Sequence, residues 1–252
     1  MRFASLGSGS RGNALVVEAG ATTVLVDCGF GPRQLARRLG RLGLAPEDVD
    51  AVLITHEHSD HIGAAARIAA RHGPTVFLTH GTLIASGLEG TRVELIDGDE
   101  PFSIGELELH PFPVPHDARE PIQFVVSDGR VRCGVLTDAG FATPHMAAML
   151  SGCQALVLEC NHDADMLAGG SYPLALKRRI AGPSGHLSNS EAASLLAGLD
   201  TSRLQHLVAA HLSLENNLPG LARTALATAL GCDPAWIGVA DQENGFAWRG
   251  IA

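Results

Sequence analysis

The chain has 252 residues, of which 46% are hydrophobic and 18% charged, and its formal net charge is −9. This composition excludes a disordered chain, and no apolar run approaches the roughly 18 residues of a membrane helix. The acidic balance argues against tight binding of nucleic acid, since domains with that partner are usually basic. The first residues turn to glycine and serine too early for a signal peptide, so we expect a cytoplasmic protein.

Short strands dominate the first half of the chain. Three are predicted between glycine-rich turns, over Arg2–Leu6, Ala14–Glu18 and Thr22–Asp27. There follow a helix over Pro32–Leu42, a buried strand over Ala51–Ile54, a helix over Ile62–Arg71, and strands over Thr75–Leu78, Arg92–Leu95, Leu107–Pro113, Ile122–Ser127 and Val131–Leu136.

Helices and strands alternate in the second half. The pattern predicts helices over Pro144–Leu150, Pro173–Ile180, Ser190–Leu199 and Leu218–Leu230, with strands over Ala155–Glu159, His206–Ala210 and Phe246–Trp248. No repeat or linker interrupts the chain. We therefore expect one layered α/β domain over residues 1–252, with helices covering the faces of the sheets.

Histidine, the commonest metal ligand, occurs 12 times. The segment Thr55–His61 directly follows a predicted strand, and His116, Asp138 and His211 each follow an apolar strand of their own. Because ligand sites in α/β sheets gather at the carboxyl ends of strands, we expect these four loops to converge on a metal site. The candidate ligands in the first loop are His56, His58, Asp60 and His61.

The pattern His-x-His-x-Asp-His, followed by a later His, Asp and His, resembles the metallo-β-lactamase superfamily over most of the chain. Within it, the sequence is similar to the YycJ/WalJ branch of metal-dependent hydrolases. The segments that carry the resemblance are Ser5–Asn13, Pro115–Asp117, Leu136–Gly140, Glu159–Asp163 and Gly185–Asn189. The resemblance implies a four-layer αββα sandwich with a dinuclear metal site at one edge.

The same resemblance implies a division of the ligands between two divalent ions. One ion would be held by His56, His58 and His116, the other by Asp60, His61 and His211, and Asp138 would bridge them. Zinc is the expected metal, with manganese or iron as alternatives, because imidazole and carboxylate ligands suit all three. Asp60 is also expected to orient the hydroxide that the two ions share.

Two positions and one segment bear on the type of reaction. His58 disfavours the flavo-diiron oxidoreductases, which have an acidic residue there, and Asp138 disfavours the true β-lactamases. The segment from Gly185 resembles the phosphodiesterases of the superfamily, including the tRNA 3′-processing nucleases. By that resemblance, Glu159 holds His186, which supplies a proton to the leaving oxygen.

Four further residues are candidates for substrate binding. Asn13, or its neighbour Ser10, lies in a glycine-rich turn that is expected to face the metals, and Asn161 is expected either in the substrate cleft or in a local turn. Ser188 or Asn189 opens a predicted helix, where it can cap the helix and also help the helix N-terminus to bind phosphate.

Two basic segments bear on the substrate as well. The arginines Arg33, Arg37, Arg38 and Arg41 recur at helical spacing, and Lys177–Arg179 precedes the His186 segment. We expect solvated helix faces here, and contacts with phosphate are the alternative.

These features together predict a dinuclear hydrolase of phosphodiester bonds. The expected substrate is nucleic acid, met transiently at a strand end, and the resemblance implies 5′-to-3′ exonuclease action. A thioester or lactone hydrolase of the glyoxalase-II type is an alternative, because it shares the bridging aspartate. A non-catalytic regulatory protein with a structural metal is a third possibility, but structural zinc sites are usually rich in thiolates and this site has none.

Overall fold

The computed structural model describes residues 1–88 and 92–252, and within them the strands form two seven-stranded sheets. In the first sheet, β3 to β6 run parallel and the other neighbours pair antiparallel. Its strands, in spatial order, are β14 (Phe246–Gly250), β1 (Arg2–Gly7), β2 (Ala14–Ala19), β3 (Thr22–Val26), β4 (Ala51–Leu53), β5 (Thr75–Leu78) and β6 (Val93–Leu95).

The second sheet also combines parallel and antiparallel pairs. Strands β10 to β13 are parallel, whereas β7 to β10 pair antiparallel. The spatial order is β13 (Gly238–Val239), β12 (His206–Ala210), β11 (Ala155–Glu159), β10 (Arg132–Leu136), β9 (Ile122–Ser127), β8 (Leu107–Pro113) and β7 (Phe102–Ile104).

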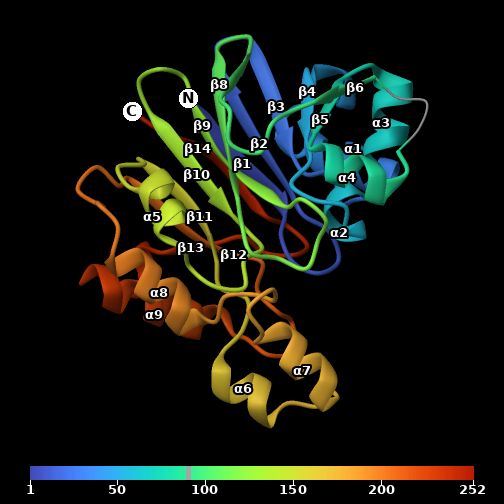
Figure 1. Ribbon diagram of the computed structural model, residues 1–252. Helices are drawn as coiled ribbons and strands as arrows, with labels where there is room; N and C mark the ends of the chain where they lie inside the picture. The colour runs from blue at the N-terminus through green and yellow to red at the C-terminus, as the bar shows by residue number, and fades with distance from the viewer. Residues whose placement is uncertain (89–91) are drawn as a thin grey trace.

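Helices cover the outer faces of both sheets, and Figure 1 shows the four layers. The first sheet is covered by α1 (Pro32–Gly40), α3 (Ala65–His72) and α4 (His80–Ser86), and the second by α5 (Pro144–Leu150), α8 (Asn189–Ala197) and α9 (Pro219–Leu230). The predicted αββα sandwich is therefore confirmed. Among the described residues, no helix is long and apolar enough to cross a membrane.

The central strands are apolar on both faces because each sheet packs against the other sheet and against helices. In β3, Val24 and Val26 join the core between the sheets, while Leu25 packs under the outer helices. In β11, Val157 faces the other sheet and Leu156 faces the outer helices. This alternation follows from the two-residue period of side chains along a strand.

The helix predicted over Ile62–Arg71 is confirmed only from Ala65 onward, because two helices occupy this region. Helix α2 (Ser59–Ile62) ends at Gly63, whose φ of 32° favours glycine, and α3 begins two residues later. A Cβ atom on Gly63 would lie 2.5 Å from the carbonyl oxygen of Cys28, so the chain needs glycine for this close approach. The break leaves the histidine-rich loop and α2 free to face the site.

Some short elements were not predicted from the sequence. They are α4, α6 (Ala164–Gly169), β7 and β13, together with two 3₁₀ turns over Pro46–Asp48 and Pro234–Trp236. Helix α6 and the following α7 (Leu174–Ile180) project from the sandwich at the bottom of Figure 1. None of the residues of α7 is buried.

The predicted solvated face of α1 is wrong at Arg38, which is only 3% exposed. Its guanidinium carbon lies 4.0 Å from the ring centroid of Phe30. The same group donates hydrogen bonds to the carbonyl oxygens of Leu6 and Glu243, each at 2.6 Å. Arg38 therefore connects α1 to the end of β1 and to the turn before β14.

Candidate active site

The candidate ligands converge at one edge of the sandwich, where several strands of both sheets end. His56 and the residues of α2 follow β4, while His116, Asp138 and His211 follow β8, β10 and β12. The candidate ligand atoms lie within 4.8 Å of one another in several groups of three, among them His56 with His58 and His116, His56 with His61 and Asp138, and Asp60 with His61 and His211. The structure thus brings together all seven residues that the sequence pattern singles out as ligands.

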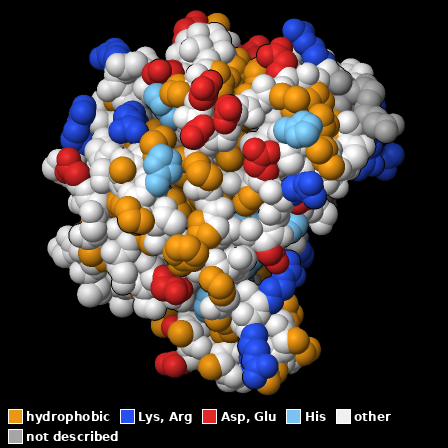
Figure 2. Space-filling view, in the orientation of Figure 1, with side chains coloured by type: hydrophobic (Ala, Val, Ile, Leu, Met, Phe, Trp, Pro, Cys, Tyr) orange, Lys and Arg blue, Asp and Glu red, His pale blue; other side chains and the backbone are white. Residues whose placement is uncertain are grey.

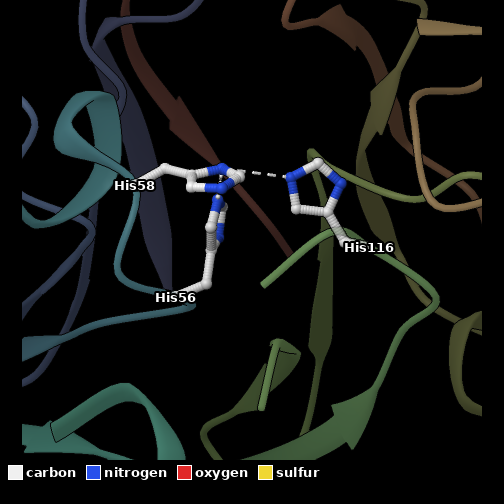
Figure 3. A group of neighbouring side chains, drawn as sticks. All are labelled: His56, His58 and His116. Carbon is white, nitrogen blue, oxygen red and sulfur yellow. Dashed lines mark hydrogen bonds between the residues drawn. The ribbon is translucent and has the colours of Figure 1, made fainter. Parts of the chain in front are cut away.

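Three histidines form the first cluster, and Figure 3 shows His116 facing His56 and His58 from the opposite side. The Nδ1 atom of His58 lies 3.0 Å from Nε2 of His56 and 3.3 Å from Nε2 of His116. His56 is fully buried and His116 nearly so, whereas His58 stands at the rim of the cavity. Three ring nitrogens from two different sheets therefore face the same small volume.

Neighbouring groups determine where two of these rings carry their protons. The Nδ1 atom of His116 lies 3.0 Å from the carbonyl oxygen of Gly185, which can only accept, so the proton is on Nδ1. The Thr55 hydroxyl donates to Asp27 and so accepts from Nδ1 of His56 at 3.0 Å. Both Nε2 atoms therefore present lone pairs toward the third imidazole.

The second cluster contains two histidines and two carboxylates. One carboxylate oxygen of Asp138 lies 3.1 Å from Nε2 of His61 and 3.1 Å from Nδ1 of His211. Asp60 is next to them, with its Oδ2 atom 3.5 Å from Nε2 of His61. The other oxygen of Asp138 lies 3.8 Å from Nε2 of His116, so this carboxylate stands between the two clusters.

Burial alone would raise the pKa of Asp138, but the imidazoles of His211 and His61 outweigh it and hold the pKa well below its usual value. The carboxylate is therefore ionised at neutral pH.

A buried aspartate that the sequence analysis did not single out supports the second cluster. Asp27 follows β3 and is 2% exposed, and its Oδ2 atom lies 2.7 Å from Nδ1 of His61. It also accepts hydrogen bonds from the backbone and the hydroxyl of Thr55. Asp27 therefore orients His61 so that Nε2 points into the site. The sequence contained an indication of this role, because Asp27 ends a strand at the same sheet edge as the candidate ligands.

The donor set fits divalent cations. It consists of imidazole nitrogens and carboxylate oxygens without a thiolate, which suits zinc and other first-row metals. A single Nδ1 proton on His58 would have to be shared between the two Nε2 lone pairs that face it, whereas a cation would accept lone pairs from all three rings. The second ring nitrogen of His56, His61 and His116 bonds to a carboxylate, hydroxyl or carbonyl oxygen, as is usual for metal-bound histidine.

A histidine–glutamate pair lies beside the two clusters, as the resemblance implied. Nδ1 of His186 is 2.8 Å from Glu159, which is fully buried. The other oxygen of Glu159 accepts from the backbone of Ala139 and Leu187. Burial lowers the pKa of His186, but the charge and hydrogen bond of Glu159 outweigh it and raise this pKa to about 9. His186 is therefore protonated, with one edge on the cavity.

The predicted substrate-binding residues separate into two groups. Asn161 lines the cavity, and so does Ser10. Asn13 is 3% exposed, and its amide nitrogen lies 3.1 Å from Nε2 of His61. Asn13 is therefore buried and contacts a candidate ligand.

Ser188 and Asn189 do not line the cavity among the described residues, which corrects their predicted contact with substrate. Ser188 forms a capping box with Glu191 at the start of α8. The amide of Asn189 is buried and donates to Asn217 at 2.9 Å. Both residues therefore stabilise the fold around the site.

The cavity above the ligands has a volume of about 390 Å³. On one side the cavity is bounded by residues from α7 and from the segment before it. Of these, the sequence indicated only the basic run Lys177–Arg179. Arg179 of that run donates from Nε to Asp117 at 2.6 Å. The lining residues from this side are Tyr172, Leu176, Arg179 and Ile180.

Comparison with known proteins identifies the family. The chain matches the beta-lactamase superfamily domain over residues 22–211. It is 34% identical over 236 residues to the exodeoxyribonuclease YycJ of Bacillus anthracis, with 91% of this chain and 89% of that protein covered. It is 30% identical over 245 residues to the exodeoxyribonuclease WalJ of Streptococcus pneumoniae, with 94% and 91% covered.

Solved structures agree on the fold. The metallo-beta-lactamase fold protein YhfI from Bacillus subtilis superposes with a TM-score of 0.76 at 17% identity, and 98% of each chain is covered. The resemblance seen in the sequence is thereby confirmed, and the chain belongs to the beta-lactamase superfamily, with the metallo-β-lactamase fold.

Proposed function

We propose that this protein is a metal-dependent nuclease that hydrolyses phosphodiester bonds at the ends of nucleic acid strands, in the 5′-to-3′ direction. The observation that carries the proposal is the His186–Glu159 pair at 2.8 Å beside seven convergent candidate ligands. The names of two relatives that match nearly the whole chain, both exodeoxyribonucleases, favour DNA as the substrate.

The proposed metal centre contains two divalent ions, with zinc preferred over manganese and iron. His56, His58 and His116 would hold one, Asp60, His61 and His211 the other, and Asp138 would contact both. Bound in this way, two such ions supply Lewis acidity and lower the pKa of water from about 15.7 to about 7.

Residues of the chain supply the remaining steps. Asp60 borders the cavity, where its carboxylate accepts a hydrogen bond from the attacking water and directs a lone pair of that water at phosphorus. His186 keeps its Nδ1 proton on Glu159 and donates the proton on Nε2 to the departing oxygen. A buried carboxylate thus fixes the ring that delivers the proton.

We also propose that the protein works in the cytoplasm and meets its substrate transiently. All five cysteines are free, and four of them are buried, which suits a reducing compartment. The net charge of −9 disfavours tight coating of nucleic acid, so brief contact with a strand end is expected.

The test measures hydrolysis of bis(p-nitrophenyl) phosphate and of end-labelled single-stranded DNA and RNA. Asp60→Ala should lose most activity on all of these substrates. His186→Ala should lose about 100-fold or more on DNA and RNA, the usual contribution of a general acid, but much less on bis(p-nitrophenyl) phosphate, because p-nitrophenolate leaves without a proton. His145→Ala is the matched control, because His145 is exposed on α5 and should not affect either substrate.

Three outcomes would contradict the proposal. Normal cleavage by Asp60→Ala would exclude the mechanism. Turnover of thioesters or lactones without dependence on His186 would indicate an acyl hydrolase, and metal-stabilised folding without turnover of any of these substrates would indicate a regulatory protein.

A further inference from the structure

The cavity above the candidate ligands has one apolar wall, made by Tyr172, Leu176 and Ile180. These residues are spaced four apart, and the last two lie within α7. Residues at i and i+4 of a helix share one face, so α7 presents Leu176 and Ile180 side by side. Tyr172 extends this surface just before Pro173, the N-cap of α7.

The opposite side of the cavity is polar. It carries the rims of both ligand clusters and the proposed acid, namely His58, Asp60, Asp138, His186 and His211. A substrate that fills this cavity therefore needs a charged group on one side and a flat apolar group on the other. A nucleotide has both, as a phosphate and a base.

The apolar wall is held to the catalytic side by a few specific contacts. Arg179 binds Asp117, the residue that follows the candidate ligand His116. The backbone nitrogen of His186 donates to the carbonyl oxygen of Ile180 at 2.9 Å. Since α7 buries none of its side chains in the core, these contacts determine how far the wall stands from the metal centre. Figure 2 shows the α6–α7 region as a lobe below the sandwich, with Lys and Arg side chains on its surface.

We propose that Tyr172 stacks on the base of the nucleotide that adjoins the scissile phosphate, with Leu176 and Ile180 completing the binding site for that base. This inference rests on the proposed nuclease function and assigns its substrate to unpaired strand ends. A base inside a duplex is stacked on both faces, and a terminal paired base is held in place by its partner, whereas an unpaired strand end can turn its base toward the tyrosine. The volume of about 390 Å³ is near the lower end of small-molecule sites, which suits a single nucleotide inside the cavity.

The experiment compares two end-labelled single-stranded DNA oligonucleotides, one intact and one with an abasic residue in place of the nucleotide next to the scissile phosphate. The metal-loaded wild type should cleave the intact strand with a kcat/KM about 10-fold higher or more, since stacking on an aromatic side chain typically contributes about this factor per base. Tyr172→Ala should lose this preference, while its cleavage of the abasic strand should stay within about twofold of wild type.

Two variants serve as controls. Tyr172→Phe keeps the aromatic face and should keep the preference for the intact strand. Leu174→Ala lies on the same segment, but Leu174 is 61% exposed and lines a different cavity, between α6 and α7. This variant should behave like wild type on both strands.

The outcomes separate the inference from the function on which it rests. If the wild type cleaves the intact strand but Tyr172→Ala keeps the full preference, the stacking role is wrong and the nuclease function stands. Equal losses by Tyr172→Ala on both strands would indicate a structural role and also overturn the inference. If the metal-loaded wild type cleaves neither strand, the proposed function itself fails, and the inference with it.

Discussion

Two residues other than glycine have a left-handed backbone among the described residues, and both lie at the candidate active site. Asp27 has a φ of 62° and His211 a φ of 53°. Each conformation is held by hydrogen bonds, because Asp27 donates from its backbone to Leu53 and His211 donates to the hydroxyl of Ser8. Such a conformation costs roughly 1–2 kcal/mol for most residues, so it is retained where it positions a functional side chain.

Replacing Asp27 by asparagine should weaken metal binding. Asparagine keeps the shape and tolerates a positive φ, but it loses the negative charge that faces Nδ1 of His61 at 2.7 Å. Changes of this kind next to a metal-bound histidine lower metal affinity by about 10–100-fold. Competition with a chelator of known affinity measures the change. Unaltered affinity in Asp27→Asn would show that Asp27 only supports the fold.

The seven candidate ligands could be found from the sequence because each belongs to a metal-binding residue type and follows an apolar strand. Asp27 follows the same rule but stands outside any motif, so nothing in the pattern separated it from a turn residue. Tyr172 could not be found, since its role depends on how α7 returns over the cavity. Ser188 and Asn189 were expected at the phosphate because they open a helix, but capping and packing occupy their side chains.

At the scale of elements, the basic face of α1 differs from the expectation at one position, Arg38. Its basic residues recur at helical spacing, and Arg37 is exposed as predicted. Arg38 lies at the border between the exposed and buried faces of α1. At such a position, helical spacing does not show whether the side chain reaches solvent or a carbonyl group from a distant part of the chain. The partners of Arg38 come from both ends of the chain, which no local pattern connects.

Replacing Arg38 by methionine should destabilise the protein. Methionine fills much of the same volume, but the carbonyl oxygens of Leu6 and Glu243 each lose one of two arginine donors, because Arg41 also donates to both. Each lost hydrogen bond costs about 1 kcal/mol, so we expect the free energy of unfolding to fall by about 2 kcal/mol in a urea titration. Arg37→Met is the matched control on the same helix, with a change within about 0.5 kcal/mol. Equal effects of the two substitutions would contradict the role of Arg38.

Element boundaries were predicted well where a strand is buried on both faces, because its apolar run ends where burial ends. Strands β5, β9, β11 and β12 begin and end as predicted. Strand β8 does so as well, although one of its faces is partly exposed. The single helix expected over Ile62–Arg71 is confirmed only from Ala65 onward, because the break at Gly63 serves a close contact with Cys28, a residue far along the chain. Short elements such as β7 and β13 have too few residues to show a periodic pattern of hydrophobic side chains.

At the scale of the whole molecule, the candidate metal centre joins the two sheets. His56, His58, Asp60 and His61 come from the first sheet's edge, and His116, Asp138 and His211 from the second sheet. The ligand atoms of the three-histidine cluster are shared between them. A bound ion therefore connects the two halves of the sandwich at this edge, and metal binding should be linked to folding of the whole domain.

Removal of metal should therefore lower the melting temperature. An ion present at about 1,000 times its Kd stabilises the folded state by about 4 kcal/mol, which for a chain of this size corresponds to a Tm difference of roughly 8–16 °C. Calorimetry of the protein with zinc, and again after chelation, measures this difference.

The control replaces His58 and Asp60 by alanine, because their side chains are 29% and 21% exposed and their loss should spare the core. In this variant the metal-dependent difference should shrink, while the Tm after chelation stays near that of wild type. Equal melting temperatures for the wild type with and without metal would show that the ligand cluster does not join the sheets through an ion.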